Sequence, residues 1–492
     1  MTRRLASDSL GVIPDNVARP EYDRAQHGSG IVHLGVGAFH KAHQAVYTDT
    51  AMALSGGNWR IDGVSLRSPA ARDALVPQDG LYTVCQLQDG QQDMRIVGAL
   101  RDVHVAPENP ERVIALLARP SIHIVTTTIT EKGYCLTPGT GTLDLAHPDI
   151  SADLSNPAVP VSAIGYVGAA ITRRHAVNAP VTIVSCDNLS GNGRKFQDAV
   201  LQYLELTAPT SVSWCQANVR FPCTMVDRIV PGATLDLRQR VAGALGVDDE
   251  ACVAAEPFSQ WVIEDIASGP LPDWAGAGAV FSREVERYEL MKLRLLNAAH
   301  SAIAYLGVIG GVAHVSDAMA NPGFRSMIRH MMVAEIAPIL RSPKGFDVQR
   351  YIDALIDRFS NAALLHRTEQ IAMDGSQKLP QRILPTLRER ASQGLESPAL
   401  ALAVAGWIRF ASGLTLEHRP IDVLDPLRPD LRRASSVSGN RRDRVAEFFS
   451  IAPIFGADIH AWAAVIDEVA SALRRLECEG LDGAITAVIA RK

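Results

Sequence analysis

Residues 31–54 read IVHLGVGAFHKAHQAVYTDTAMAL, and this stretch decides the fold expected for the chain. It opens with an apolar run that ends at Gly35 and Gly37, which is typical of a buried strand followed by a tight turn. Residues 38–54 then have helical periodicity, and WRIDGVSL at 59–66 has the composition of a second strand. A strand, a helix and a strand with glycines at the first turn predict a βαβ unit of the dinucleotide-binding type.

The turn after the first strand has two of the three glycines of the dinucleotide fingerprint, and His40 occupies the third position. Glycine lets the backbone approach a pyrophosphate, and the following helix N-terminus favours an anion. A tight turn without a ligand would have the same pattern, so both interpretations stay open here. The candidate cofactor contacts at this turn are Gly35, Val36, Gly37, Phe39 and His40.

The end of the second strand bears on the choice between NAD and NADP. An acidic residue there would bind the ribose hydroxyls and favour NAD. This chain has Leu66-Arg67-Ser68-Pro69 at that place. Arg67 could face the 2′-phosphate of NADP or stack on the adenine, so the sequence leaves the cofactor preference open.

Strand and helix patterns continue to alternate until about residue 284. The strand VTIVSC ends at Asp187 and Asn188, at the sheet edge where α/β proteins bind ligands. Asn188 is therefore a candidate donor to a substrate oxygen, although an Asx turn that closes the strand would look the same. Asp227 and Arg228 lie between apolar pairs, which predicts a buried ion pair or an acid that faces a site.

From residue 285 onward helical patterns dominate, so we expect a dinucleotide-binding domain at 1–284 and a mainly helical domain at 285–492. The second domain opens with ELMKLRLLNAAH, which has no Pro or Gly. At about 100° per residue, Glu289, Lys292, Asn297 and His300 share one arc of roughly 140°. Leucines within and beside this arc indicate that it is not simply a solvated face, although a snorkelling Lys292 and a core His300 remain the alternative.

These residue types suit acid–base chemistry at a carbonyl oxygen. Desolvation among leucines lowers the pKa of a lysine, as a lysine base near neutral pH requires. Asn and His beside it can hydrogen-bond an alkoxide or a carbonyl oxygen. Farther along, DGSQKLPQR at 374–382 is expected to be a polar loop, either a solvent-exposed linker or a place where Lys378 and Arg382 face an anionic substrate.

Composition narrows the classes of function. The net charge of −5 gives no reason to expect nucleic acid or an anionic membrane as a partner. Seven scattered cysteines without a CxxC pair indicate neither a zinc ribbon nor a disulfide framework. We take the HxxH at His40–His43 as structural and expect no metal. The N-terminus lacks an apolar signal-peptide core, so a cytoplasmic protein is expected.

Seven motifs together resemble the long-chain mannitol dehydrogenase family. They span about residues 30–410 and are IVHLGVGAFHKAHQAVYTD, TITEKGYC, SCDN, FPCTMVDRIVP, EPFSQWVIED, MKLRLLNAAHSAIAYLG and DGSQKLPQR. The resemblance implies a metal-independent oxidoreductase with a Rossmann-like domain that uses NAD, or else NADP. It also implies a monomer or a weak homo-oligomer.

The resemblance also assigns roles to residues. Lys292 matches the catalytic lysine, which acts as base in alcohol oxidation and as acid in ketone reduction. Asn188 and Asn297 match the asparagines of an oxyanion hole, and His300 matches a substrate-orienting histidine. Glu289 matches a glutamate that relays protons. Asp227 and Lys378 match contacts to substrate hydroxyls.

The substrate is expected to be an open-chain sugar derivative. The motifs favour interconversion of D-fructuronate and D-mannonate, with the region of Arg382, together with Arg367, facing the sugar carboxylate. The alternative within the family is an uncharged polyol such as mannitol, arabinitol or sorbitol. A catalytically silent dinucleotide-binding regulator would have no need for the complete set of catalytic residues.

Overall fold

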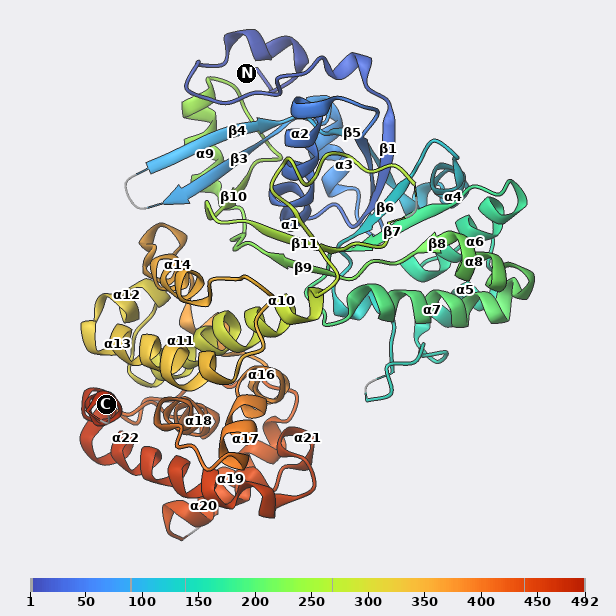
Figure 1. Cartoon of the computed structure of the whole chain (residues 1–492). Coiled ribbons are helices and arrows are strands. Elements are labelled where there is room, and N and C mark those ends of the chain that lie inside the picture. The colour runs from blue at the N-terminus through green and yellow to red at the C-terminus, as the bar shows by residue number, and fades with distance from the viewer. Residues whose placement is uncertain (1–2, 89–90, 138, 268, 438, 491–492) are drawn as a thin grey trace. The chain divides into compact units, whose positions relative to one another are not determined.

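The computed structural model describes residues 3–88, 91–137, 139–267, 269–437 and 439–490. The chain forms two compact units that divide between Glu286 and Arg287 (Figure 1). Each unit has its own architecture: the N-terminal unit contains the sheets, and the C-terminal unit is helical. Among the described residues, no helix is both long enough and apolar enough to cross a lipid bilayer.

A parallel sheet organises the N-terminal unit. Its strands lie in the order β5-β2-β1-β6-β7-β8. This is the order of a doubly wound dinucleotide fold, in which the chain reverses direction across the sheet between β1 and β6. The predicted α/β fold is therefore confirmed. The strands are β1 (Ser29–Leu34), β2 (Arg60–Ser65), β5 (Leu100–Val105), β6 (Ile124–Thr127), β7 (Val181–Ser185) and β8 (Val219–Arg220).

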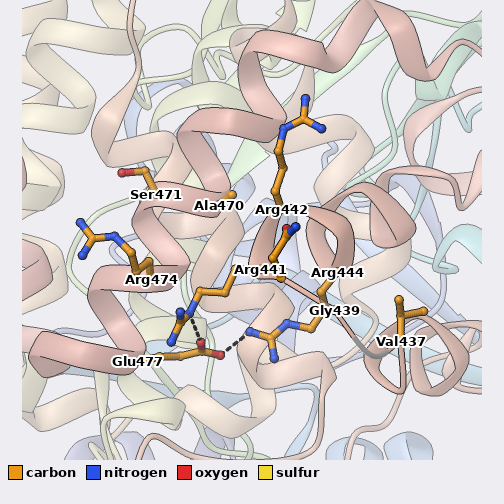
Figure 2. Close-up of a pocket in the computed structure, with 10 residues that line it drawn as sticks. Val437, Gly439, Arg441, Arg442, Arg444, Ala470, Ser471, Arg474 and Glu477 are labelled. Carbon is orange, nitrogen blue, oxygen red and sulfur yellow. Dashed lines mark hydrogen bonds and ion pairs between the residues drawn. The ribbon is translucent and has the colours of Figure 1, made fainter.

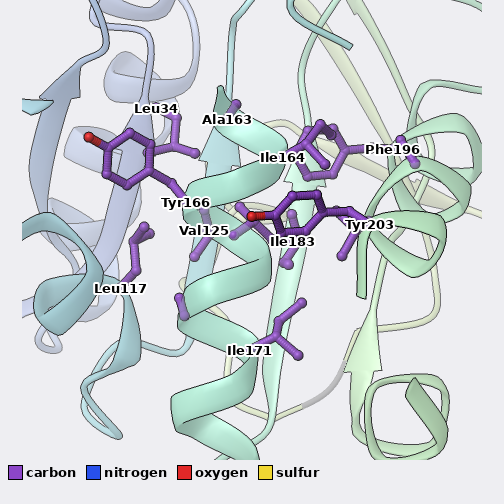
Figure 3. Close-up of a cluster of buried hydrophobic side chains, with 14 of the residues drawn as sticks. Leu34, Leu117, Val125, Ala163, Ile164, Tyr166, Ile171, Ile183, Phe196 and Tyr203 are labelled. Atoms are coloured by element: carbon purple, nitrogen blue, oxygen red, sulfur yellow. The ribbon is translucent and has the colours of Figure 1, made fainter. Parts of the chain in front are cut away.

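Apolar residues on both faces of these strands explain why the sheet is covered on both sides. In β1, Val32 and Leu34 join one buried cluster, whereas Ile31 joins the other. The first cluster lies under α4 (Pro110–Ala118), α6 (Ala163–Ala176) and α7 (Asn192–Thr207). Figure 3 shows Ile164 and Ile171 of α6 beside strand residues of this cluster. The other face is covered by α2 (Gln44–Ser55).

The helix expected at 38–54 is in fact two helices, α1 (Ala38–Ala42) and α2. His43 separates them with φ −125° and ψ −91°, which is not helical. Its Nε2 lies 2.9 Å from the carbonyl oxygen of Gln260, and its ring packs edge-on against Trp261. Both partners are more than 200 residues away in the chain, so local periodicity could not reveal the break.

Two smaller sheets and four further helices complete the N-terminal unit. The segment before β1 packs against the rest of the unit: Leu5, Ile13 and Val17 are buried, and the Leu5 amide donates to the Asp248 carbonyl. One smaller sheet contains β3 (Tyr82–Gln88), β4 (Gln91–Val97) and β10 (Val253–Ala255). The other contains β9 (Thr224–Asp227), β11 (Gln260–Glu264) and β12 (Val280–Ser282). The helices are α3 (Ala70–Leu75), α5 (Pro148–Ser155), α8 (Val212–Asn218) and α9 (Leu235–Leu245).

The C-terminal unit packs around α18 (Pro398–Ala411), which is buried along its whole length. Buried Glu335 accepts the N-terminal amides of this helix from Ala399 at 2.7 Å and Leu400 at 2.9 Å, and desolvation raises the pKa of its carboxyl to about 7. The helical unit confirms the predicted fold class. The other helices are α10 (Val285–Met291), α11 (Ala298–Ile309), α12 (Val315–Ala320), α13 (Pro322–His330), α14 (Val348–Ser360), α15 (Thr368–Ala372), α16 (Gly375–Arg382), α17 (Leu384–Ser392), α19 (Arg428–Ser435), α20 (Arg441–Phe449), α21 (Ala452–Phe455) and α22 (Ala463–Ile489).

The polar segment 374–382 forms helix α16, so the prediction of a loop was wrong. Asp425 stabilises the start of this helix, since its carboxylate accepts the Ser376 amide at 2.8 Å and the Ser376 hydroxyl at 2.6 Å. Gly375 is needed because an added Cβ would lie 2.4 Å from Nε1 of Trp407. The segment is therefore helical through contacts with distant residues, despite its low intrinsic propensity.

Candidate functional site

The turn after β1 lies at the carboxyl edge of the parallel sheet. Gly35 has φ +98°, and a Cβ there would lie 2.2 Å from the carbonyl oxygen of Thr128, next to the end of β6. Gly37 is exposed, and a Cβ there would meet nothing nearer than the Gly35 oxygen at 3.9 Å. Gly35 therefore permits close passage of two backbones, while Gly37 borders open space at the place where this fold binds a pyrophosphate.

Two histidines stack directly behind this turn. The rings of His33 and His40 are 3.4 Å apart, and neither ring nitrogen of His40 has a hydrogen-bond partner among the described residues. Burial lowers the pKa of His33 to about 3 and also lowers the pKa of His40, which favours the neutral form of both rings. Phe39 is half-buried and stacks on His43 at 5.0 Å.

Metal-ligating side chains gather elsewhere in this unit. Within the described part of the chain, the acid, His and Cys side chains close enough to share an ion are Cys135, His147 and Asp149. The Nδ1 atom of His147 accepts the Asp149 amide at 3.2 Å. Burial and nearby carboxylates raise the pKa of the Cys135 thiol to about 12, which opposes formation of the thiolate that binds metals.

Arg67 follows β2 and is exposed, as the cofactor hypothesis requires, but it has an acidic partner. Its guanidinium forms an ion pair with Asp149 at the start of α5. The sequence analysis missed Asp149, because the pairing joins residues 82 positions apart. The end of β2 has no acidic residue of its own, and Asp149 at the start of α5 places a carboxylate beside it.

The end of β7 carries Asp187 and Asn188. Asp187 is buried and accepts hydrogen bonds from the Thr130 amide at 2.7 Å and the Tyr134 hydroxyl at 3.1 Å. Desolvation raises the pKa of Asp187 to about 6. The next residue, Asn188, is exposed. Asp187 therefore ties two loops together at the carboxyl edge of the sheet, directly beside the candidate amide donor.

Asp227 is the last residue of β9 and is buried. The neighbouring Arg228 is also buried, and its guanidinium donates to the carbonyl oxygens of Ala42 and Glu256. Arg228 therefore ties together three segments of the N-terminal unit. Asp227 stays a candidate contact to substrate.

In the C-terminal unit, the polar residues of the predicted arc lie on the buried side of one helical run. Glu289, Lys292, Asn297 and His300 are each 7–8% exposed, whereas Leu290 is 40% exposed. This inverts the usual preference, in which leucine is buried and charged residues face water. Between α10 and α11, residues Lys292–Asn297 form a π-helical turn. The assumed step of about 100° per residue therefore fails there, and such turns are frequent at functional sites.

Positive charge surrounds His300. Its ring lies 5.0 Å from that of His366 and 4.9 Å from that of Phe359. Burial lowers the pKa of His300 most, and the charges of Arg382, Arg358 and Lys378 lower it further. Helix α16 packs against both the π-helical turn and α11, and Arg382 donates to the Ser301 hydroxyl at 3.1 Å.

Two of the predicted basic contacts have partners within the unit. The Lys378 ammonium donates to the carbonyl oxygens of Ile371 at 3.0 Å and Met373 at 2.5 Å, and burial lowers its pKa. Of its three N–H groups, one remains for another partner. Arg367 is exposed and pairs with Glu369 at 2.7 Å.

The sequence analysis did not single out Arg358 and His366 as site residues. Arg358 lies on amphipathic α14 and is buried beside Phe359, which is the signal that could have identified it. A buried arginine on an apolar helix face usually has a charged or polar partner. Its proximity to His300 depends on how α14 packs and is invisible in the sequence.

Family models match nearly the whole chain. The mannitol dehydrogenase Rossmann domain matches residues 29–276, and the mannitol dehydrogenase C-terminal domain matches residues 284–477. D-mannonate oxidoreductase of Escherichia coli (strain K12) is 42% identical over 468 residues, covering 94% of this chain and 96% of that protein. Mannitol 2-dehydrogenase of Phaeosphaeria nodorum is 37% identical, covering 97% and 84%.

Solved structures agree with these matches. The Pseudomonas fluorescens mannitol 2-dehydrogenase ternary complex with NAD and D-mannitol superimposes with a TM-score of 0.86 at 34% identity, covering 99% of this chain and 100% of that one. A D-sorbitol dehydrogenase in substrate-free form gives 0.90 at 30% identity with the same coverage. The chain therefore belongs to the mannitol dehydrogenase family, and it is an NAD(P)-dependent oxidoreductase that acts on CH–OH groups.

Proposed function

We propose that this enzyme is a fructuronate reductase, which interconverts D-fructuronate and D-mannonate. The observation that carries this proposal is a group of basic side chains near His300: Arg382 donates to the adjacent Ser301, and Arg358 lies next to Phe359, whose ring is 4.9 Å from that of His300. A sugar carboxylate can accept charge-assisted hydrogen bonds from such side chains, whereas mannitol or fructose offers only neutral acceptors. Guanidinium groups match a carboxylate through paired hydrogen bonds. The 42% identity to D-mannonate oxidoreductase also supports this choice.

The residues of the C-terminal unit would handle the substrate. The bound nicotinamide supplies the hydride that converts the ketone carbon to an alcohol. Lys292 donates a proton to the ketone oxygen in reduction and takes it back in oxidation. Asn297 stabilises charge on that oxygen, His300 orients the substrate, and Glu289 returns a proton to the lysine.

The residues of the N-terminal unit would hold the cofactor at the carboxyl edge of β1 and β6. The open space at Gly37 fits a pyrophosphate, and the neutral rings behind the turn add no competing charge. Phe39 and Val36 contribute apolar contacts. Asn188 is proposed as an amide donor to the substrate oxygen, and Asp227 as a contact to a substrate hydroxyl.

A matched rate assay tests the choice of substrate. NADH and NADPH would each be tested with D-fructuronate and with D-fructose at pH 7. We expect kcat/KM for D-fructuronate to exceed that for D-fructose by about 100-fold or more, because a site built to hydrogen-bond a carboxylate disfavours a sugar that lacks one. Equal or faster reduction of fructose would contradict the proposal and identify a polyol dehydrogenase.

Replacing Arg382 tests whether its positive charge recognises the carboxylate of the sugar. Arg382→Ala is expected to lower kcat/KM for D-fructuronate by about 10- to 100-fold, the value of one hydrogen bond to a charged group. The rate with D-fructose should change much less. Arg350→Ala removes an exposed arginine that belongs to α14, and it serves as the matched control. An unchanged KM for D-fructuronate in Arg382→Ala would contradict the assignment.

We further propose that the enzyme prefers NAD, because Asp149 neutralises Arg67 beside β2. An arginine that is held by a carboxylate cannot also bind a 2′-phosphate without breaking that pair, and the carboxylate itself repels the phosphate. In Asp149→Asn, the ratio of kcat/KM for NADPH to that for NADH is expected to rise about 3- to 10-fold. Adding Arg67→Gln to the Asp149→Asn variant should return this ratio of kcat/KM values to that of the unmodified enzyme. A ratio that does not move in Asp149→Asn would refute this explanation.

A further inference from the structure

A cavity of about 610 Å³ opens between α20 and α22 of the C-terminal unit. Four arginines line it, Arg441, Arg442, Arg444 and Arg474, together with Glu477 (Figure 2). No residue assigned above to cofactor or substrate belongs to this cavity. Its volume lies within the range of sites for small molecules, and it greatly exceeds the volume of one ordered water.

Glu477 holds two of the arginines in place. Its carboxylate accepts Nε of Arg441 at 2.6 Å and Nη2 of Arg444, and Figure 2 shows both side chains turned towards it. Buried Arg409 lies 4.0 Å from the same carboxylate. One negative charge is thus shared among three guanidinium groups, so a net positive charge remains and the two lining arginines are pre-organised.

Among the residues that the structure describes, the other two arginines pair with exposed carboxylates outside the cavity. Arg442 donates to Asp467 at 2.6 Å, and Arg474 lies 3.9 Å from Glu479. Exposed pairs of this kind contribute little, so these guanidinium groups can turn to a ligand at small cost.

Two further donors are available at the cavity. Nε of Arg444 is buried and has no hydrogen-bond partner among the described residues. Arg441 and Arg442 also begin the nine-residue helix α20, which Asn440 caps by accepting the Asp443 amide at 3.0 Å. The first amides of a helix have no partner within it and carry partial positive charge, which favours an anion there.

We infer that this cavity binds the phosphate group of a small phosphorylated molecule. Several guanidinium forks, an unpaired buried N–H and a helix N-terminus match a tetrahedral dianion with several acceptor oxygens. Arg441 and Arg444 meet at Glu477 within a recess, so a small molecule fits better than a nucleic acid backbone. The site is a second anion site, separate from the residues proposed for the reaction.

Isothermal titration with inorganic pyrophosphate at pH 7 and low chloride tests the inference. The intact enzyme should bind one pyrophosphate per chain, and Arg474→Gln should raise Kd at least about tenfold, the loss expected for one charge-assisted hydrogen bond. Arg474 is half exposed and only loosely paired, so its replacement should preserve the fold. Arg444→Gln provides a second, independent variant within the cavity.

Arg433→Gln is the matched control, because Arg433 is exposed on neighbouring α19 and pairs with Asp430 outside the cavity. It should bind pyrophosphate as the unmodified enzyme does. The inference is overturned by the absence of saturable binding, or by the same Kd in all three variants. Tighter binding of a short single-stranded DNA than of pyrophosphate, lost in Arg474→Gln, would overturn the assignment to a small molecule.

Discussion

Replacing Lys292 with alanine is expected to lower kcat by about 10²- to 10⁴-fold, the usual contribution of a positioned general acid or base. Lys292 is buried at the first position of a π-helical turn, between Glu289 and Asn297 on the same buried side. The proposal assigns the dinucleotide to the N-terminal unit, so NADH should still bind to the variant with a Kd within about twofold of the original. The measurement is a steady-state rate assay paired with a fluorescence titration of NADH.

The variant Lys292→Arg distinguishes a role of Lys292 in proton transfer from a purely electrostatic role. Arginine keeps a positive charge but does not release its proton in a protein. This variant should therefore be nearly as slow as Lys292→Ala if Lys292 moves a proton. Lys344→Ala, which removes an exposed lysine of the same unit, should keep the full rate. Normal turnover by Lys292→Ala would rule out the lysine mechanism and favour a protein whose dinucleotide binding serves another purpose.

Gly35→Ala is expected to destabilise the N-terminal unit by about 3 kcal/mol or more. Gly35 has φ +98°, and a methyl group there would lie 2.2 Å from the Thr128 carbonyl oxygen. Strain of the left-handed backbone contributes about 1–3 kcal/mol, and the clash adds to it because the oxygen belongs to the backbone that follows β6 and cannot rotate away. The midpoint of urea unfolding, followed by tryptophan fluorescence, measures the loss.

Gly37→Ala is the matched comparison, because its added methyl group meets only open space in the protein. Unfolding should barely change, whereas the Kd for NADH should rise about tenfold if the pyrophosphate passes over this residue. The two variants thus separate a glycine that the fold needs from a glycine that the ligand needs. Equal stability of both variants would refute the structural role given to Gly35.

The candidate site was only partly visible in the sequence. Helical periodicity placed Glu289, Lys292, Asn297 and His300 on one arc, and all four are indeed buried. The π-helical turn at Lys292–Asn297 was not foreseen, because it changes the hydrogen-bond spacing and leaves the pattern of apolar residues intact.

Pairings between residues far apart in the chain could not be predicted from local sequence patterns. Asp149 reaches Arg67 across 82 positions, and Asp425 caps α16 across 49 positions. The first pairing underlies the proposed preference for NAD, and the second turns a predicted loop into a helix. Arg358 likewise approaches His300 only because α14 packs beside it.

By itself the sequence determined the first strand–helix–strand unit, the glycine turn after β1, the mainly helical second half and the family. These features depend on residue types at short spacings, where backbone sterics and apolar periodicity act directly. Only the tertiary structure decided which charged side chains meet: Asp149 pairs with Arg67, Arg382 lies near His300, and Arg441 and Arg444 share Glu477. Electrostatic pairing depends on distance in space, and folding brings together residues whose separation along the chain carries no such information.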